Sequence, residues 1–531
     1  MAHGRWWRDA VIYEIYIRSL TDGSGDGVGD IAGIRARLPY LRDLGVDAVW
    51  ITPWYRSPMA DGGYDVADYR DIDPLFGTLA EAEDLIRETH EHGLRLLIDL
   101  VPNHTSDQHR WFQAALAAGP GSPERARYIF RDSKDPDQPP NDWRSVFGGP
   151  AWTRVPDGQW YLHLFAPQQP DLNWASPEVR AELEDIVRFW LDLGVDGFRI
   201  DVAHGMVKDP DLPDLGPGYR DLVGPQDRPD HPFWDRDGVH EIYRSWRRLV
   251  DSYGGERIFI AEAWVATPNR LARYVRPDEL HTAFNFDFLE CSWDAAAFRG
   301  VIDRSLLALH GVGAPATWVL SNHDVKRHVT RYGRPAGQRT GPVDLDVGTR
   351  RARAALLLML ALPGSAYLYQ GEELGLEEVE DLPDEVLQDP RWTSSGHTVR
   401  GRDGCRVPLP WQGQRPPFGF GPDGSRPWLP QPEGWWARTV EYEDQDPDSM
   451  LNLYRAALRV RRDHPALGDG TLTWADSPDD VLVLRREPGL VCAANLSDAP
   501  FPLPDRERVL LASEPLHNGK LPRDATVWLQ V

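Results

Sequence analysis

The sequence has little positive charge for its length. Its 531 residues include 58 Lys and Arg against 82 Asp and Glu, which gives a formal net charge of −24 at pH 7. Negative charge of this size argues against binding to nucleic acid and to anionic membrane surfaces. Neutral and cationic small molecules stay open as substrates.

Cysteines and long apolar stretches are also scarce. Cys291, Cys405 and Cys492 lie far apart, lack metal-ligand spacing and leave at least one thiol unpaired, which fits a reducing compartment. The first residues contain no apolar signal core, and the longest apolar run, residues 354–362, is too short to span a bilayer. We therefore expect a soluble cytoplasmic protein, a monomer or a homodimer, without a membrane partner.

What the sequence does contain is a repeated plan in which a helix end and a glycine are followed by an apolar strand. Residues 41–51 and 190–200 share this plan closely, and residues 90–100 have the same form. Gly194 is expected to be left-handed, just past the C-terminus of its helix. Repeated units of this kind imply parallel strands that are covered by helices.

Eight strand candidates can be placed along the chain. Eight parallel strands with intervening helices close into a (β/α)8 TIM barrel, whose active site lies at the C-terminal ends of the strands. The candidates are the three strands of the repeat and residues 11–17, 257–262, 281–286, 316–321 and 366–370.

Several stretches depart from the barrel rhythm. Residues 105–170 are rich in Pro, Asp, Gly and Trp and too long for a simple loop, so they predict an inserted lobe after the third strand. Short alternating runs near the C-terminus predict a small all-β domain. Long loops at 206–237 and 374–445 are expected to wall the barrel mouth into a pocket. The predicted division is barrel at 1–103, lobe at 104–171, barrel at 172–465 and β-domain at 466–531.

Arg199 and Asp201 end the fourth predicted strand. Side chains alternate along a strand, so both project from the same face. A carboxylate at a strand end beside a fixed cation stays ionised, which suits a nucleophile, although a structural ion pair fits the same spacing. Polar side chains at other strand ends, acids and histidines among them, favour a catalytic site. These side chains are Tyr64, Asp65, Asp99, Asn103, His104, Glu262, Asn322, His323 and Asp324.

A glycine-rich acidic loop follows the first predicted strand. Hard cations take several oxygen ligands around a tight turn, and a solvated acidic turn is the alternative. We predict one structural Ca²⁺ or Mg²⁺ here and no cofactor for catalysis. The proposed ligands are Asp22, Ser24, Asp26, Asp30 and the carbonyl of Val28.

Together these motifs resemble the α-amylase family of retaining glycoside hydrolases and transglycosylases, over almost the whole chain. Asp99-Leu-Val-Pro-Asn-His104, Gly197-Phe-Arg-Ile-Asp201, Phe259-Ile-Ala-Glu-Ala-Trp264 and Asn322-His-Asp324 look like its four signature regions, in order. Gln169-Pro-Asp-Leu-Asn173 looks like the fifth, and it resembles the branch that holds oligo-1,6-glucosidases and α-glucosidases.

The resemblance implies a role for each of these residues. Asp201 would be the nucleophile, Glu262 the general acid/base, and Asp324 the holder of the sugar's 2- and 3-hydroxyl groups. Asp65 would bind the 4-hydroxyl of a terminal glucose together with Arg402, for which Arg406 is the alternative. The remaining implied sugar contacts are Tyr64, His104, Phe165, Arg199 and His323. The cation loop resembles that of the branch, except that Ser24 stands where an asparagine is usual.

The residues agree with this chemistry. Retaining cleavage needs two carboxyl groups about 5–5.5 Å apart, one ionised to attack and one protonated to release the leaving oxygen. Asp201 beside Arg199 fits the first role. Glu262, flanked by Ile260 and Trp264, fits the second, because an apolar setting keeps a carboxyl group protonated.

We therefore predict an exo-acting α-glucosidase that releases glucose from the non-reducing end of short α-glucosides, of the maltose or isomalto-oligosaccharide type. A transglycosylase or isomerase, such as a sucrose isomerase, amylosucrase or trehalose synthase, would share the same catalytic residues. A non-catalytic relative, like the heavy chains of amino-acid transporters, is disfavoured because the chain has no anchor and keeps all three acids. Val202, directly after the nucleophile, slightly favours α-1,6 links.

Overall fold

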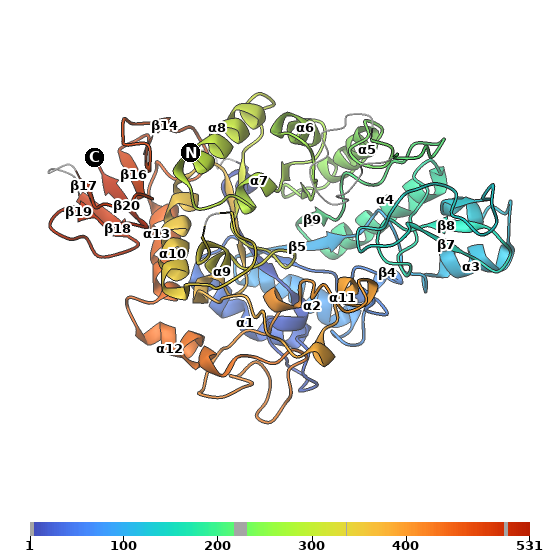
Figure 1. The fold of residues 1–531 in the computed structure, drawn as a ribbon, viewed down its shortest axis with the longest axis horizontal. Coiled ribbons are helices and arrows are strands. Elements are labelled where there is room, and N and C mark those ends of the chain that lie inside the picture. The colour runs from blue at the N-terminus through green and yellow to red at the C-terminus, as the bar shows by residue number, and fades with distance from the viewer. Residues whose placement is uncertain (1–4, 217–230, 336, 504–507) are drawn as a thin grey trace.

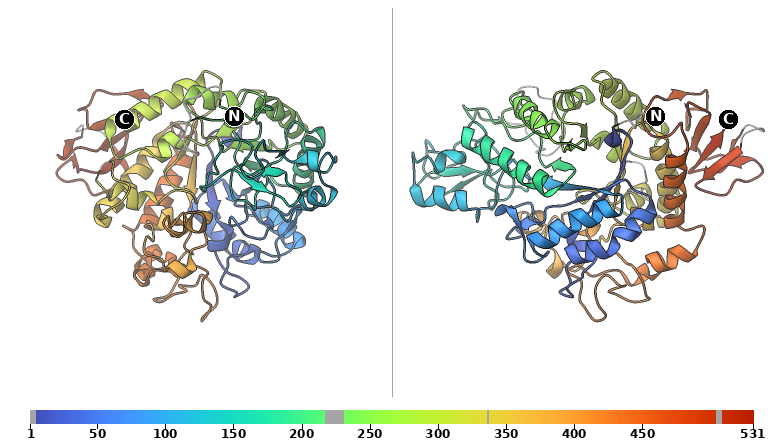
Figure 2. Two further views of the ribbon diagram at one scale, coloured as in Figure 1. Left: turned by 45° about the vertical axis from the view of Figure 1, so that its right-hand side comes forward. Right: turned by 180° about the vertical axis from the view of Figure 1, so that it is seen from behind.

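The computed structural model describes residues 5–216, 231–335, 337–503 and 508–531. A barrel of strands and helices occupies the middle of the molecule, with the inserted lobe at one end and the C-terminal sheet at the other (Figure 1). The view from behind shows the same order along the long axis (Figure 2). Within the predicted loop at 206–237, residues 217–230 lie outside the described residues.

Eight strands form the barrel sheet, joined by parallel pairings in the order β11-β10-β9-β5-β2-β1-β13-β12. The hydroxyl of Thr317 in β12 donates to the carbonyl of Ala283 in β11, so the barrel is nearly closed. The predicted (β/α)8 barrel is confirmed. Its strands are β1 (Val11–Ile15), β2 (Ala48–Ile51), β5 (Arg95–Leu100), β9 (Gly197–Ile200), β10 (Ile258–Ala261), β11 (Thr282–Ala283), β12 (Thr317–Val319) and β13 (Ser365–Tyr369).

One helix follows each barrel strand and covers the outside of the sheet. Gly45 and Gly194 end two of these helices with left-handed φ values of 102° and 108°, as predicted for Gly194. Thr78 and Glu81 form a capping box that starts another. The helices are α1 (Ile31–Leu44), α2 (Leu79–Glu91), α4 (Pro177–Leu193), α5 (Val239–Asp251), α6 (Pro268–Tyr274), α8 (Ala295–His310), α10 (Leu345–Ala361) and α13 (Met450–Asp463).

Alternate residues of the barrel strands point to opposite sides of the sheet. In β1, Ile12 belongs to the apolar cluster that fills the barrel, whereas Val11 and Tyr13 belong to the cluster beneath the helices. In β10, Ile260 points inward and Phe259 outward in the same way. This alternation fixes which strand-end side chains face the barrel mouth.

The inserted lobe lies between β5 and α4. Its two ends meet where His104 and Asp171 form an isolated bridge. Its apolar cluster includes Trp143 and Trp152 and extends to Val202 of the barrel. The lobe therefore packs directly beside the end of β9. Its elements are α3 (Arg110–Ala118) and an antiparallel sheet of order β6-β8-β7, with β6 (Phe130–Arg131), β7 (Trp152–Arg154) and β8 (Trp160–Leu162).

The C-terminal domain is an antiparallel sheet that packs on α10. The indole N–H of Trp528 donates to the carbonyl of Leu357 at 3.0 Å, and Arg486 donates to the carbonyl of Ala361 at 2.8 Å. The sheet order is β14-β15-β16-β20-β18. Its strands are β14 (Thr473–Trp474), β15 (Val481–Arg486), β16 (Leu490–Asn495), β18 (Arg508–Ala512) and β20 (Ala525–Gln530), beside the pair β17 (Phe501–Pro502) and β19 (Lys520–Leu521).

Shorter elements lie in the loops. The pair β3 (Tyr55–Arg56) and β4 (Asp68–Ile72) follows β2, and the helices are α7 (Phe286–Leu289), α9 (His328–Tyr332), α11 (Pro390–Ser394) and α12 (Val440–Gln445). No helix in the described part of the chain is long and apolar enough to cross a membrane. All three cysteines are buried free thiols.

Candidate active site

A buried polar layer lies at the C-terminal ends of the barrel strands. Glu14 and Asp99 follow the inward-facing Ile12 and Leu97 by two residues, so they face the same interior. Arg199 on β9 is in register with Asp99 on β5. All three polar side chains are buried. The strand register thus brings charged groups together above the apolar barrel core.

Arg199 contacts three carboxylates. Its Nη1 donates to Asp201 Oδ1 at 2.6 Å and to Asp99 Oδ1 at 2.7 Å. Its Nη2 lies 3.2 Å from Glu262 Oε2. The predicted contact between Arg199 and Asp201 is present, and Asp99 is a third acid at the same cation.

Three buried acids around one cation compete for charge. Burial raises the pKa of Asp201 well above its ordinary value, Arg199 opposes that shift, and Glu262 and Asp99 add to it. Burial likewise raises the pKa of Asp99 to about 6, against the opposing charge of Arg199. The sequence suggested that the cation alone keeps Asp201 ionised. The structure shows that Arg199 is not sufficient for this. The cluster favours holding one proton among its acids, which is what a pair made of a nucleophile and an acid requires.

Glu262 has a more polar setting than its sequence neighbours suggest. Its Oε1 accepts a hydrogen bond from Trp264 Nε1 at 2.9 Å, and its Oε2 accepts one from the backbone N–H of Val202 at 2.8 Å. The expected apolar setting is therefore wrong, because the end of β9 brings a backbone donor and Arg199 to this carboxylate. Val202 has a φ of 47°, which is rare for a β-branched residue.

Asp324 is held between two arginines. Its Oδ1 accepts from Arg402 Nη1 at 3.0 Å and from Arg406 Nη2 at 3.1 Å. Burial raises its pKa, but the charges of Arg402 and Arg406 oppose burial, and the net pKa of Asp324 is lowered. Asp324 is therefore a fixed anion that can accept hydrogen bonds from sugar hydroxyl groups.

Arg402 pairs with Asp61 and not with Asp65. Its Nη2 donates to Asp61 Oδ1 at 2.6 Å, and its Nε donates to Asp389 at 2.5 Å. Asp65 accepts instead from the backbone amides of Ala60 and Asp61, both at 2.9 Å. The predicted pair of Asp65 with Arg402 is therefore wrong: Asp65 closes the turn that presents Asp61. Burial raises the pKa of Asp65 to about 6.

A chain of hydrogen bonds links Tyr64 to the barrel interior. The Tyr64 hydroxyl lies 2.8 Å from His323 Nε2, and the two rings stack with centroids 5.4 Å apart. His323 Nδ1 lies 2.5 Å from Glu14 Oε1. Burial raises the pKa of Glu14 and lowers that of His323, so the two share one proton as a neutral pair.

The strand ends and the lobe enclose one cavity of about 710 Å³. From the lobe, Phe165 reaches His104 with ring centroids 5.1 Å apart, and Gln169 Nε2 lies 3.1 Å from His104 Nε2. Arg199 and Asp65 are not in the cavity wall and act through the side chains in front of them. The predicted site residues in the wall are Tyr64, His104, Phe165, Asp201, Glu262, His323, Asp324 and Arg402.

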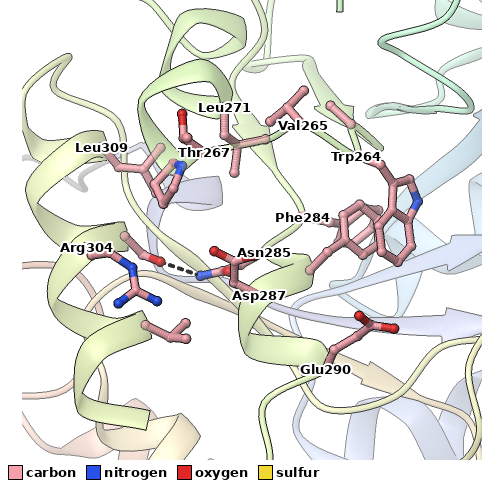
Figure 3. Close-up of a pocket in the computed structure, with 15 residues that line it drawn as sticks. Trp264, Val265, Thr267, Leu271, Phe284, Asn285, Asp287, Glu290, Arg304 and Leu309 are labelled. Carbon is pink, nitrogen blue, oxygen red and sulfur yellow. Dashed lines mark hydrogen bonds between the residues drawn. The ribbon is translucent and has the colours of Figure 1, made fainter. Parts of the chain in front are cut away.

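A smaller pocket of about 290 Å³ lies behind Trp264 (Figure 3). Trp264 stacks on Phe286 with ring centroids 3.6 Å apart and belongs to the walls of both spaces. Leu271 and Leu309 contribute apolar surface to this pocket. Neither Asp201 nor Glu262 lines it, so of these two spaces only the larger cavity holds the two candidate catalytic acids.

The acidic glycine loop at residues 22–30 is held by its own backbone. Asp22 accepts from the amide of Gly27 at 2.9 Å, and Asp30 accepts from the amides of Ser24 at 2.8 Å and Gly33 at 2.7 Å. Within the described residues, no group of three or more His, Cys, Asp or Glu side chains is arranged to hold a metal ion. Asp22 and Asp30 thus already have backbone partners, and the cation stays a prediction.

Several residues of the site were missed from the sequence, and three of them show why. Asp61 shares one loop with Asp65, and spacing does not tell which carboxylate reaches the cavity. Glu14 lies within a predicted strand, where its inward direction follows only from the register. Trp234 lines the cavity and stacks on His204 at 4.6 Å, but nothing in the composition of its loop marks it.

Two family models match successive parts of the chain. The family described as alpha amylase, catalytic domain, matches residues 14–470. A domain of unknown function (DUF3459) matches residues 468–528. The chain therefore belongs to the α-amylase family, and it is a glycoside hydrolase.

Individual relatives extend over nearly the whole chain. A probable alpha-glucosidase of Rhizobium meliloti is 39% identical, over 93% of this chain and 90% of the relative. An oligo-1,6-glucosidase of Parageobacillus thermoglucosidasius is 36% identical, over 89% and 87%. The crystal structure of an alpha-glucosyl transfer enzyme, XgtA, is 38% identical, with a TM-score of 0.87 and 99% of both chains covered. The resemblance to the α-glucosidase and oligo-1,6-glucosidase branch is thus confirmed.

Proposed function

We propose that the protein is a retaining, exo-acting α-glucosidase that releases glucose from the non-reducing end of short α-glucosides. The observation that carries this proposal is the pair of Arg402 and Asp61 at 2.6 Å, with Asp324 and Asp389 on the same guanidinium. We expect a charged pair at one end of the cavity to block further glucose units there. It also offers charge-assisted hydrogen bonds to a terminal 4-hydroxyl group.

The chemistry is a double displacement. Arg199 holds Oδ1 of Asp201, which leaves Oδ2 free to attack the anomeric carbon. As that bond forms, the glycosidic C–O bond breaks and Glu262 gives its proton to the leaving oxygen. Glu262 then takes a proton from water, whose oxygen attacks the same carbon and displaces the Asp201 carboxylate. Two inversions give net retention of the anomeric configuration.

The product pattern tests the proposal. An α-linked maltoheptaose or isomaltoheptaose should lose single glucose units from its non-reducing end, and soluble starch should be a poor substrate. Early fragments of middle length without free glucose would show internal cleavage and refute the closed end. Glucose that appears first as the α-anomer in an NMR time course would support retention.

A second candidate function is glucosyl transfer. The observation that favours it is the likeness to the alpha-glucosyl transfer enzyme XgtA. The first displacement is common to both reactions, and an alcohol then replaces water in the second. Glucose and transfer products measured at rising acceptor concentration separate the two reactions. A panel of maltose, isomaltose, sucrose, trehalose and kojibiose tests whether Val202 accompanies a preference for α-1,6 links.

We also propose that residues 22–30 bind a structural Ca²⁺ or Mg²⁺. The loop offers hard oxygens from Asp22, Asp26 and Asp30, the Ser24 hydroxyl and the Val28 carbonyl. Burial raises the pKa of Asp30, several backbone amides oppose that shift, and the charge of Asp22 adds to it. A divalent cation would relieve this repulsion. It plays no part in the steps above.

A further inference from the structure

A third cavity, of about 490 Å³, opens off the catalytic cavity. Seven basic and three acidic side chains line it, in a chain whose formal net charge is −24. Positive charge is thus concentrated beside the active site of an acidic protein. The two cavities share six wall residues, which are Glu290, Asp324, Val325, Arg339, Arg391 and Arg402.

Several of these cations already have carboxylate partners. Glu380 pairs with both Lys326 and Arg334. Asp524 pairs with Arg351 at 3.0 Å. The guanidinium of Arg402 is shared among three aspartates. The charges of these groups are thus neutralised within the cavity wall and add no net positive charge for an anionic ligand.

In the described part of the chain, two guanidinium groups in the wall have no carboxylate partner, and a third has only a distant one. Arg331 donates to the backbone carbonyls of Lys326 at 2.9 Å and Leu320 at 2.5 Å. Arg339 lies 3.9 Å from Glu290, and its side chain is 87% exposed. The side chain of Arg391 is half-buried and makes no hydrogen bond or ion pair with any described residue.

Arg391 is the most informative of the three. Burial, and then the charge of Arg402, lower its pKa. The charges of Asp389, Asp324 and Asp61 raise the pKa of Arg391, but all three carboxylates are hydrogen-bonded to Arg402. A partly buried cation without its own partner is unfavourable unless a ligand supplies the opposite charge.

The short helix α11 fixes Arg391 at the boundary of the two cavities. Asp389, directly before this helix, binds Arg402, and the hydroxyl of Ser394 at its other end donates to the carbonyl of Phe147 at 2.5 Å. Arg402 and Phe147 both line the catalytic cavity. Arg391 is therefore anchored through the walls of the active site itself.

We propose that this side cavity binds the anionic group, a phosphate or a carboxylate, of an α-glucoside whose leaving group is negatively charged. Arg391 is the principal contact, and Arg339 and Arg331 add positive charge. The inference rests on the proposed function. Because the pair of Arg402 and Asp61 closes the end of the cavity that holds the glucosyl unit, the negative charge must lie on the leaving group. Planar guanidinium groups bind carboxylate and phosphate through two parallel hydrogen bonds.

Matched substrates test the inference. We would compare the α-glucoside of 4-hydroxybenzoate with that of its neutral methyl ester, and trehalose 6-phosphate with trehalose. The anionic member of at least one pair should have a kcat/KM about 10-fold or more above its neutral partner at low salt. The preference should shrink as ionic strength rises.

Variants assign the preference to the cavity. Arg391→Gln should bring the ratio of anionic to neutral kcat/KM close to one, and Arg391→Lys should keep part of it. The matched control is Arg400→Gln, which removes the same charge from the same loop but pairs with Asp384 and lines neither cavity. This control should keep the wild-type ratio.

The outcomes separate this inference from the proposed function. Cleavage of the neutral glucosides with no preference in either pair, and no change in Arg391→Gln, overturns the anion site alone. No cleavage of any α-glucoside overturns the proposed function. Inorganic phosphate should compete with the anionic substrates. A different result would be that neither pair of substrates shows a preference, while phosphate changes KM for a neutral substrate only in proteins that keep Arg391. The ligand would then be a free anion, and a charge carried by the substrate would be refuted.

Discussion

At the scale of single residues, the proposed reaction depends on one free carboxylate oxygen of Asp201. Asp201→Asn keeps the shape and the contact with Arg199 but removes the nucleophilic charge, so kcat should fall by roughly 10⁴-fold or more. Steady-state kinetics on an aryl α-glucoside measures this loss. An unchanged melting curve would show that the variant is folded, and near-normal turnover in folded protein would refute the assignment.

Glu262→Gln provides a matched amide variant at the other carboxylate. It should abolish cleavage of maltose, whose leaving oxygen needs a proton. It should affect aryl glucosides with good leaving groups less, because these need little protonation. Equal losses on both kinds of substrate would contradict the role of Glu262 as the acid.

Asp61 and Asp65 should behave differently although they share a turn. Asp61→Ala removes the partner of Arg402 and of the terminal 4-hydroxyl, so KM should rise by roughly 10- to 100-fold. Asp65→Ala leaves the amides of Ala60 and Asp61 unpaired, so it should lower the free energy of unfolding by about 1–3 kcal/mol. KM and melting temperature, measured on both variants, distinguish the two effects. A large rise in KM for Asp65→Ala alone, with an unchanged melting curve, would instead support the prediction that Asp65 binds the terminal 4-hydroxyl.

At the scale of elements, the loop at residues 22–30 leads directly into α1. If it binds a divalent cation, a chelator should lower the melting temperature before it lowers kcat, because the loop lies away from the cavity wall. Asp22→Ala should make the melting curve insensitive to the chelator. Metal analysis that finds no divalent ion, together with an unchanged curve, would refute the cation and leave the backbone hydrogen bonds as the whole explanation of the loop.

The elements also show what a sequence can and cannot predict. The repeated helix, glycine and strand predicted β2, β5 and β9 and hence the barrel, because local turn chemistry and apolar runs act together there. The strand expected at 281–286 is only Thr282–Ala283, since Phe286 already begins α7. The setting of Glu262 depends on the partner that β9 supplies across the sheet. No local pattern encodes such a contact between distant segments.

At the scale of the whole molecule, buried glutamates should make stability fall with pH. Burial raises the pKa of Glu443 and of Glu372 to about 8, and that of Glu378 to about 7. Between the unfolded value of about 4.3 and these values, the folded protein holds protons that the unfolded chain releases. The stabilisation is therefore complete below about pH 4 and is lost as pH rises towards 8. Each group contributes up to about 1.4 kcal/mol per pH unit.

Glu443→Gln isolates one of these contributions. Its side chain keeps an oxygen for the amide of Leu451, which donates to Glu443 at 2.9 Å, but it no longer titrates. Between pH 5 and pH 8.5, a range set by the pKa values above, the melting temperature of this variant should fall less steeply with pH than that of the wild type. Glu441→Gln, an exposed change in the same helix α12, should follow the wild-type curve. If the melting temperatures of both variants run parallel to the wild-type curve, the prediction that Glu443 holds a proton in the folded protein is contradicted.

The register between β9 and β10 has a consequence for protein engineering. Glu262 donates its backbone N–H to the carbonyl of Ile200 at 3.0 Å, and its own carbonyl accepts from Ala203 at 2.9 Å. The two carboxylates proposed to react, those of Asp201 and Glu262, are thus fixed to one hydrogen-bonded sheet, whereas Asp61, Phe165 and Arg402 come from loops and the lobe. A designer can exchange those loops, or graft them from another barrel, to change which sugar is accepted. The spacing of the two acids would be inherited unchanged by every such chimaera.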